Sequence, residues 1–274
     1  MTEPLNPTPT GNDTIITGNV SGTGISIGQN ATSIVVIHQQ NTHPLPVNLS
    51  VLKQPLIEHY TAAVFGGRDA ELAALDDFLD DPNHPFGLLV APAGLGKTAL
   101  LVNWIARVQK LQWRVVFVPV SIRYQTASEQ VTLSMLAHGL AEIHNDLDEF
   151  RKNDQASDRL RALIIDYLRR QLPDGTNLLL VLDGIDEALG WTVGPLLSIA
   201  SPPYGLKIVV SARQLANATR ENWLTDLKWD TAKVRLFDLR PLDQPAIKAL
   251  LAQSVPELAT DPSFVAQFYR VSEG

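Results

Sequence analysis

The chain has 274 residues, of which 45% are apolar and 19% charged, and its formal net charge is −7. This length fits one large domain or two smaller ones, and the acidic balance without a lysine–arginine run argues against a nucleic-acid-binding surface. The absence of cysteine excludes disulfides and thiolate chemistry. No apolar stretch is long enough to span a membrane and residues 1–7 lack the features of a signal peptide, so we expect a cytoplasmic protein with no membrane partner.

Residues 1–50 differ in composition from the rest of the chain. They contain no lysine, arginine or aromatic residue, and glycines separate short β-type runs at 14–16, 25–27 and 33–37. We expect a disordered start over residues 1–13, followed by two or three small strands. Because the apolar content is too small for a separate core, this segment must pack on something else.

Residues 51–84 are predicted to contain a linker and a leading helix, and residues 85–274 to form the main domain. The most informative segment opens that domain. An apolar run at 86–90 is followed by the sequence APAGLGKT at 91–98 and by a helical pattern from residue 97 to about residue 109. A strand, a glycine loop ending in Gly-Lys-Thr and a helix, in this order, predict a phosphate-binding loop.

The residue types of this loop suit a nucleotide. Small residues let backbone N–H groups surround an oxyanion, and the helix directs its positive end at the same place. Lys97 would reach the β- and γ-phosphates, with a catalytic role, and the Thr98 hydroxyl would ligate Mg²⁺. Ala91 replaces the first glycine of the motif, a tolerable change because the later residues do most of the cradling. We therefore expect ATP or ADP with Mg²⁺, held by Ala93, Gly94, Leu95, Gly96, Lys97, Thr98 and Ala99.

A second strand is predicted at 113–120, followed by helical patterns around 131–143 and 160–168. The run at 178–182 has five consecutive apolar residues, which is typical of a strand buried on both faces. Asp183 ends this strand at the edge where ligands of open α/β sheets bind, and we expect it to hold Mg²⁺ together with Thr98. Asp186 or Glu187 would polarise the attacking water; the alternative is a solvated acidic turn.

A third apolar run, at 206–212, ends at Arg213. This arginine would touch the γ-phosphate and report its presence, unless it is a surface residue of a loop. A last strand is predicted near 234–237 and a helix begins around residue 247. Strands separated by helices imply a parallel sheet with right-handed crossovers.

Several motifs resemble those of STAND NTPases, the signal-transduction ATPases that include NACHT and NB-ARC proteins. The segment FGGRDAEL at 65–72 resembles their opening motif, LDGIDE at 182–187 their extended acidic motif, and SAR at 211–213 their sensor motif. LRPL at 239–242 resembles the segment that closes the nucleotide domain, and 271–274 resembles the start of the next region. The resemblance covers residues 60–274.

This resemblance implies an α/β P-loop NTPase with the sheet order 5-1-4-3-2, in which the sensor strand lies between the phosphate strand and the acidic strand. It places Arg68 near the adenine and ribose, although a surface position before a helix is equally compatible.

The resemblance also implies the N-terminal part of a longer signalling protein, for instance one of bacterial defence. Such a protein would be a slow ATPase switch that self-associates and works with a C-terminal sensor and winged-helix region. ATP is favoured over GTP, and no Asn-Lys-x-Asp run for reading guanine occurs. Two alternatives stay open: a generic P-loop ATPase with sustained turnover, and a scaffold that retains nucleotide as a structural plug.

Overall fold

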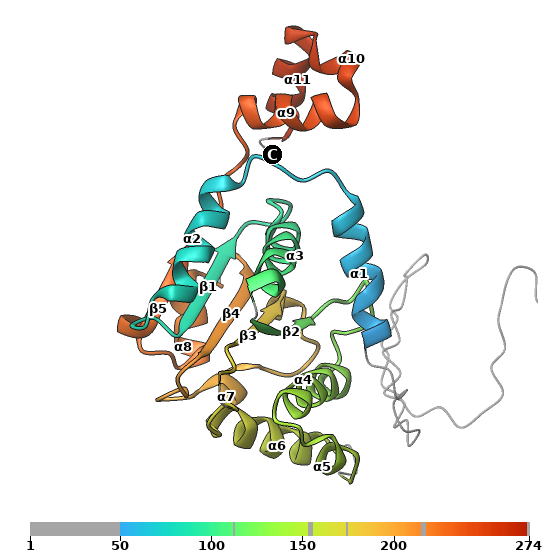
Figure 1. Cartoon of the computed structure of the whole chain (residues 1–274). Coiled ribbons are helices and arrows are strands. Elements are labelled where there is room, and N and C mark those ends of the chain that lie inside the picture. The colour runs from blue at the N-terminus through green and yellow to red at the C-terminus, as the bar shows by residue number, and fades with distance from the viewer. Residues whose placement is uncertain (1–49, 112, 153–155, 174, 215–217, 273–274) are drawn as a thin grey trace, which may run out of the picture. The chain divides into compact units, whose positions relative to one another are not determined.

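The computed structural model describes residues 50–111, 113–152, 156–173, 175–214 and 218–272 (Figure 1). The strands predicted before residue 50 and the last two residues of the motif at 271–274 lie outside this part of the chain.

Among the helices of the described residues, none is long and apolar enough to cross a membrane.

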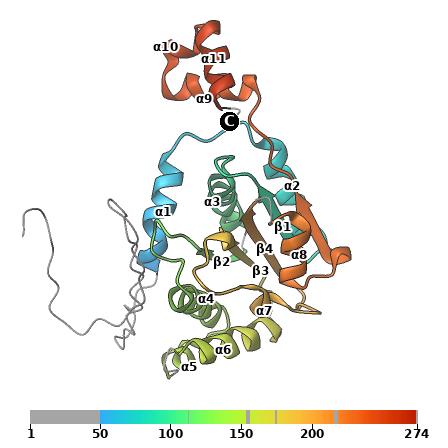
Figure 2. The ribbon, with the colours of Figure 1, turned by 180° about the vertical axis from the view of Figure 1, so that it is seen from behind.

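Five parallel strands form a single sheet with the order β2-β3-β4-β1-β5 (Figure 1 and Figure 2). This order confirms the predicted α/β fold class and the predicted strand order 5-1-4-3-2, in which β4, the predicted sensor strand, lies between β1 and β3. The strands are β1 (Phe86–Ala91), β2 (Arg114–Pro119), β3 (Leu178–Asp183), β4 (Leu206–Arg213) and β5 (Val234–Phe237).

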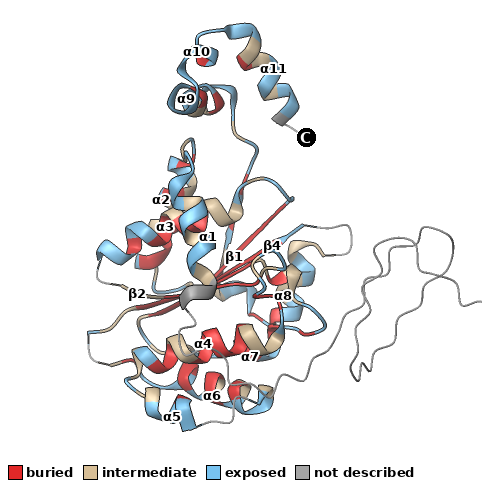
Figure 3. Cartoon of the chain, turned by 90° about the vertical axis from the view of Figure 1, so that its right-hand side faces the viewer, coloured by how far each residue is buried: buried red, intermediate tan, exposed pale blue. Residues whose placement is uncertain are grey.

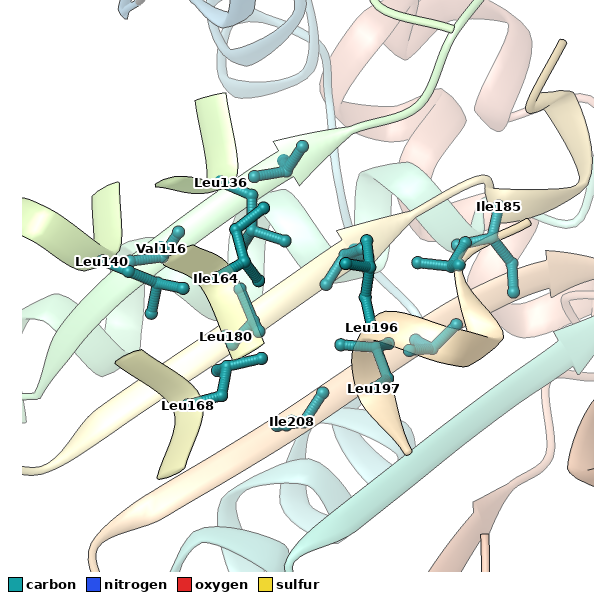
Figure 4. Close-up of a cluster of buried hydrophobic side chains, with 14 of the residues drawn as sticks. Val116, Leu136, Leu140, Ile164, Leu168, Leu180, Ile185, Leu196, Leu197 and Ile208 are labelled. Carbon is teal, nitrogen blue, oxygen red and sulfur yellow. The ribbon is translucent and has the colours of Figure 1, made fainter. Parts of the chain in front are cut away.

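Both faces of the sheet are buried under helices, which explains the continuous apolar runs of its central strands. Successive residues of a strand point to opposite faces. Leu180 of β3 therefore joins the core cluster shown in Figure 4, whereas its neighbours Leu179 and Val181 join the cluster on the other face. Figure 3 shows the buried residues concentrated in the strands and on the helix sides that face them.

The helices divide between the two faces. One face carries α1 (Ser50–Ala62), α2 (Asp69–Asp80) and α3 (Lys97–Val108), and the other carries α4 (Glu129–Ile143), α6 (Ser157–Arg169), α7 (Gly194–Leu197) and α8 (Arg220–Leu227). Short elements connect them: α5 (Leu147–Lys152) and the 3₁₀ turns Gln109–Leu111, Ile185–Glu187 and Thr231–Lys233. The C-terminal helices α9 (Gln244–Ser254), α10 (Pro256–Ala259) and α11 (Pro262–Ser272) have a small core of their own.

The segment predicted as a linker with one helix contains two helices, α1 and α2. Pro55 lies inside α1, and proline disfavours a helix interior because it lacks an N–H group and crowds the preceding turn. Leu56, the next residue, is almost completely buried in the core cluster on the α3 side of the sheet. Tertiary packing therefore stabilises a helix that local sequence preference does not favour.

Candidate functional site

The loop between β1 and α3 has an open backbone suited to an anion. Gly94 and Gly96 adopt the left-handed conformation, with φ of +82° and +87°, and a Cβ atom at either position would meet no atom within 4 Å. Gly96 is also the N-cap of α3 and supplies no side-chain cap. The first N–H groups of a helix lack intrahelical acceptors, so phosphate oxygens fit this end of α3.

Lys97, the first residue of α3, lies folded along the loop. Its Nζ donates hydrogen bonds to the carbonyl oxygens of Ala91 at 2.7 Å and of Pro92 at 2.9 Å. Burial lowers the pKa of the Lys97 ammonium, while the charges of Asp186 and Asp183 act in the opposite direction. Hydrogen bonds to phosphate oxygens would be charge-assisted at both ends and hence stronger than those to the two carbonyls.

Asp183 and Thr98, the two predicted magnesium ligands, lie close to each other, and their role in metal binding stays a prediction. Asp183 is 4% exposed at the carboxyl end of β3, and the Ser211 hydroxyl donates a hydrogen bond to its carboxylate. The Thr98 hydroxyl lies within hydrogen-bonding reach of the same group. Burial raises the pKa of the Asp183 carboxyl, and the hydrogen bonds from Ser211 and Thr98 act against that rise.

Across the described residues, no group of three or more histidine, cysteine or acidic side chains forms a metal cage. Mg²⁺ is usually held by one or two protein ligands together with phosphate oxygens and water. A hydroxyl and one carboxylate therefore fit Mg²⁺ that arrives with a nucleotide.

Arg213 is paired with both acids of the turn after β3. Its Nε lies 3.3 Å from Asp186 Oδ2, and its Nη2 donates a hydrogen bond to Glu187. Asp186 also accepts a hydrogen bond from the Arg213 backbone N–H at 2.8 Å, and Glu187 accepts one from the Ile122 N–H at 2.9 Å. The predicted sensor and the predicted water-polarising acids thus form one ion-pair cluster. Their catalytic roles stay predictions.

A pocket of about 370 Å³ adjoins the loop. Its lining is mostly apolar and comes from the segment before α2, from the loop with α3, and from the C-terminal helices and the residues leading to them: Val64, Phe65, Gly66, Arg68, Gly94, Leu95, Gly96, Ala99, Pro241, Leu242, Ile247, Leu250, Leu251, Ser254 and Phe268. Arg68 contributes to this wall, but its guanidinium is bonded to protein groups. Its predicted contact with adenine and ribose stays a prediction.

Two site residues were missed by sequence reasoning. Ser211 belongs to the quoted sensor motif, and a hydroxyl at the buried end of β4 was the available signal for its bond to Asp183. Tyr60 comes from α1, and its hydroxyl lies near Thr98, Asp183 and Tyr124. Burial raises the pKa of the Tyr60 phenol. No local pattern in the sequence indicates that α1 reaches this place.

The sheet order, the glycine loop between β1 and α3 and the buried acid at the end of β3 define a P-loop NTPase fold. Residues 64–193 match the family model described as the AAA ATPase domain. No curated protein matches the chain.

Three solved structures are among those to which this chain is similar. Cdc6p from Pyrobaculum aerophilum is 19% identical, with a TM-score of 0.46 over 69% of this chain and 49% of its own. The Orc1 protein of Aeropyrum pernix in complex with DNA is 18% identical, with a TM-score of 0.48 over 82% of this chain and 59% of its own. Drosophila ORC bound to DNA is 15% identical, with a TM-score of 0.47 over 77% and 50%. This chain thus spans about half of the length of the first structure.

Proposed function

We propose that this chain binds ATP or ADP with Mg²⁺ beside the phosphate loop, and that it hydrolyses ATP slowly as a switch of STAND type. The loop amides and Lys97 would bind the phosphates, and the apolar pocket next to them has room for a base and a sugar. Thr98 and Asp183 would hold Mg²⁺, which neutralises phosphate charge when bound.

The pairing of Arg213 with Asp186 and Glu187 carries the proposal of a switch. A γ-phosphate is an anion that competes with these carboxylates for the guanidinium, whereas a diphosphate brings no anion to that position. Only a ligand that interacts differently with two states can shift the balance between them. ATP and ADP would differ in this way at Arg213.

The contacts of this ion-pair cluster indicate which segments would be affected if the Arg213 side chain moved. Asp186 has a side chain that is only 6% exposed, and leaving a buried carboxylate without its cation is costly. Glu187 holds the backbone of Ile122, in the segment between β2 and α4. A displaced Arg213 would therefore disturb contacts of β3, β4 and this segment together.

Slow hydrolysis follows from the same pairing. A carboxylate accepts a proton from water or orients it only when its oxygen atoms are free to approach that water. As long as Arg213 occupies both acids, neither is free for this role. ATP hydrolysis would then require the ion pairs of Arg213 with Asp186 and Glu187 to rearrange first.

Calorimetric titration with ATP and with ADP tests the proposal. The proteins to compare are the parent, Arg213→Ala and Lys97→Ala. Loss of Lys97 removes a charge-assisted contact made by both nucleotides, which should cost about 1.5–3 kcal/mol, or at least about tenfold in each affinity. Arg213→Ala should weaken ATP binding by about tenfold and leave ADP binding within about threefold.

Equal losses for ATP and ADP in Arg213→Ala would show that Arg213 does not sense the γ-phosphate. A parent protein that binds neither nucleotide would contradict the function itself. Rapid, sustained turnover by the parent would favour a generic ATPase over a switch.

A further inference from the structure

Arg68, directly before α2, joins three segments that are distant in the sequence. It is 7% exposed. Its Nη1 donates hydrogen bonds to Glu71 Oε1 and to the Arg240 carbonyl, both at 2.7 Å, and its Nη2 donates one to the Leu95 carbonyl at 2.9 Å. These acceptors belong to α2, to the segment leading into α9 and to the phosphate loop.

The bond to Leu95 fixes part of the loop geometry. A trans peptide is planar, and its C=O and N–H groups point in opposite directions. Holding the Leu95 carbonyl toward Arg68 therefore turns the Gly96 N–H away from Arg68. Gly96 has a left-handed backbone with open space beside it, so neighbouring atoms do not crowd it into this conformation.

The two glycines before Arg68 pack directly against α9. A Cβ at Gly67 would lie 2.4 Å from Ala246 Cβ, and one at Gly66 would lie 3.3 Å from Leu250 Cδ2. One short segment thus contacts the helix through its backbone and the phosphate loop through the Arg68 side chain.

We propose that Arg68 is a positioning residue that links the phosphate loop to α9, so that an anion ordering the loop also holds the C-terminal helices in place. The planar guanidinium donates to all three acceptors at once, which a lysine ammonium on a flexible stem does not reproduce. The effect of the anion on α9 rests on the proposed function, because it requires phosphate binding at the loop. Coupling between two sites is reciprocal, so fixing α9 would also favour phosphate binding.

Hydrogen exchange of the full chain without ligand tests the link itself. Arg68→Lys should exchange at least about fivefold faster than the parent in the amides of residues 94–98 and of α9, with α6 unchanged as an internal reference. Arg107→Lys is the matched control, because its ion pair with Asp76 at 2.8 Å joins α3 to α2 without touching the loop. Unchanged exchange in α9 of Arg68→Lys would overturn the link.

Saturating inorganic pyrophosphate tests the coupling, since it carries no base to fill the pocket beside α9. In the parent it should slow exchange in both the loop and α9, and in Arg68→Lys in the loop alone. Equal protection of α9 in both proteins would overturn the proposal. If pyrophosphate does not slow exchange in the phosphate loop of the parent, the proposed function and the coupling are both wrong. The comparison without ligand then decides by itself whether Arg68 links the phosphate loop to α9.

Discussion

At the scale of single residues, Asp183 combines a structural cost with a proposed binding role. Burial raises the pKa of its carboxyl above the ordinary value of 3.8, so the folded protein holds this proton more tightly than the unfolded chain does. The contribution of Asp183 to the free energy of unfolding is therefore fully present below the unfolded pKa. It is lost as the pH rises through the folded pKa. At pH values above the unfolded pKa, burial of this group therefore costs the fold stability in the absence of a cation.

Asp183→Asn removes that charge and keeps an oxygen that accepts the Ser211 hydrogen bond. We expect it to melt about 2–4 °C above the parent at about pH 8, the change that ~1 kcal/mol produces in a domain of this size. The gain should shrink at about pH 5, closer to the unfolded pKa. Thermal melts at both pH values measure this, and an equal gain at both would show that the charge of Asp183 is not its cause.

The same substitution should abolish the increase in nucleotide affinity that Mg²⁺ produces, because Asn offers the cation no charge. Titration of the parent and of Asp183→Asn with ADP, with and without Mg²⁺, checks this. If Mg²⁺ raises the ADP affinity of the variant as much as that of the parent, Asp183 is not a ligand of the metal.

Asp186→Asn and Glu187→Gln keep side-chain shape and remove a carboxylate. At least one should abolish ATP hydrolysis while ATP affinity stays within about fivefold of the parent, because a residue that positions water acts mainly in the transition state. Glu187→Gln should shift that affinity upward, since it removes a competitor for Arg213. Phosphate-release assays with parallel titrations decide; parent-like hydrolysis in both variants would rule out the catalytic role of these acids.

At the scale of elements, α4 approaches β2 through a glycine. A Cβ at Gly139 would lie 2.8 Å from Val116 Cγ1, closer than such contacts allow, and a valine side chain has little freedom to move aside. The helix can therefore lie this near the strand only because Gly139 has no side chain.

Gly139→Ala tests this contact. Alanine favours a helix over glycine by about 1 kcal/mol, but overpacking a core costs about 1–3 kcal/mol, so we expect net destabilisation. Adding Val116→Ala to Gly139→Ala should recover part of the lost unfolding free energy. The effect of Val116→Ala on the parent protein would not lead one to expect such a gain. Urea unfolding of the single and double variants gives the coupling, and additive effects would contradict direct crowding.

At the scale of the whole chain, the site is built from described residues between Tyr60 and Phe268. We expect removal of residues 1–49 to leave ATP affinity within about twofold, because their composition and predicted short strands suit contacts outside the ATPase domain. Titration of the shortened protein, with a thermal melt to confirm folding, measures this. A large loss of affinity in a folded protein would show that the segment belongs to the site.

The sequence by itself determined the chain order of the five strands and the strand–loop–helix setting of the phosphate loop. Apolar runs of strand length, a helical period between them and the Gly-Lys-Thr loop are local patterns, and local backbone preferences express them directly. The alternation of strands with helices predicts parallel strands, whose carboxyl ends lie on the same side of the sheet, so Lys97, Asp183 and Arg213 were expected on that side. The resemblance to STAND NTPases added the expectation that β1, β3 and β4 are neighbours, and the sheet order agrees with it.

Only the tertiary structure decided how these side chains are partnered. Arg68 bonds the carbonyl of Arg240, 172 residues away, and Tyr60 reaches Thr98 from a helix that contains a proline. Arg213 meets both acids of the turn after β3. Such partners are selected by the packing of distant segments, and no periodicity along the chain records which of several polar groups will share a buried place.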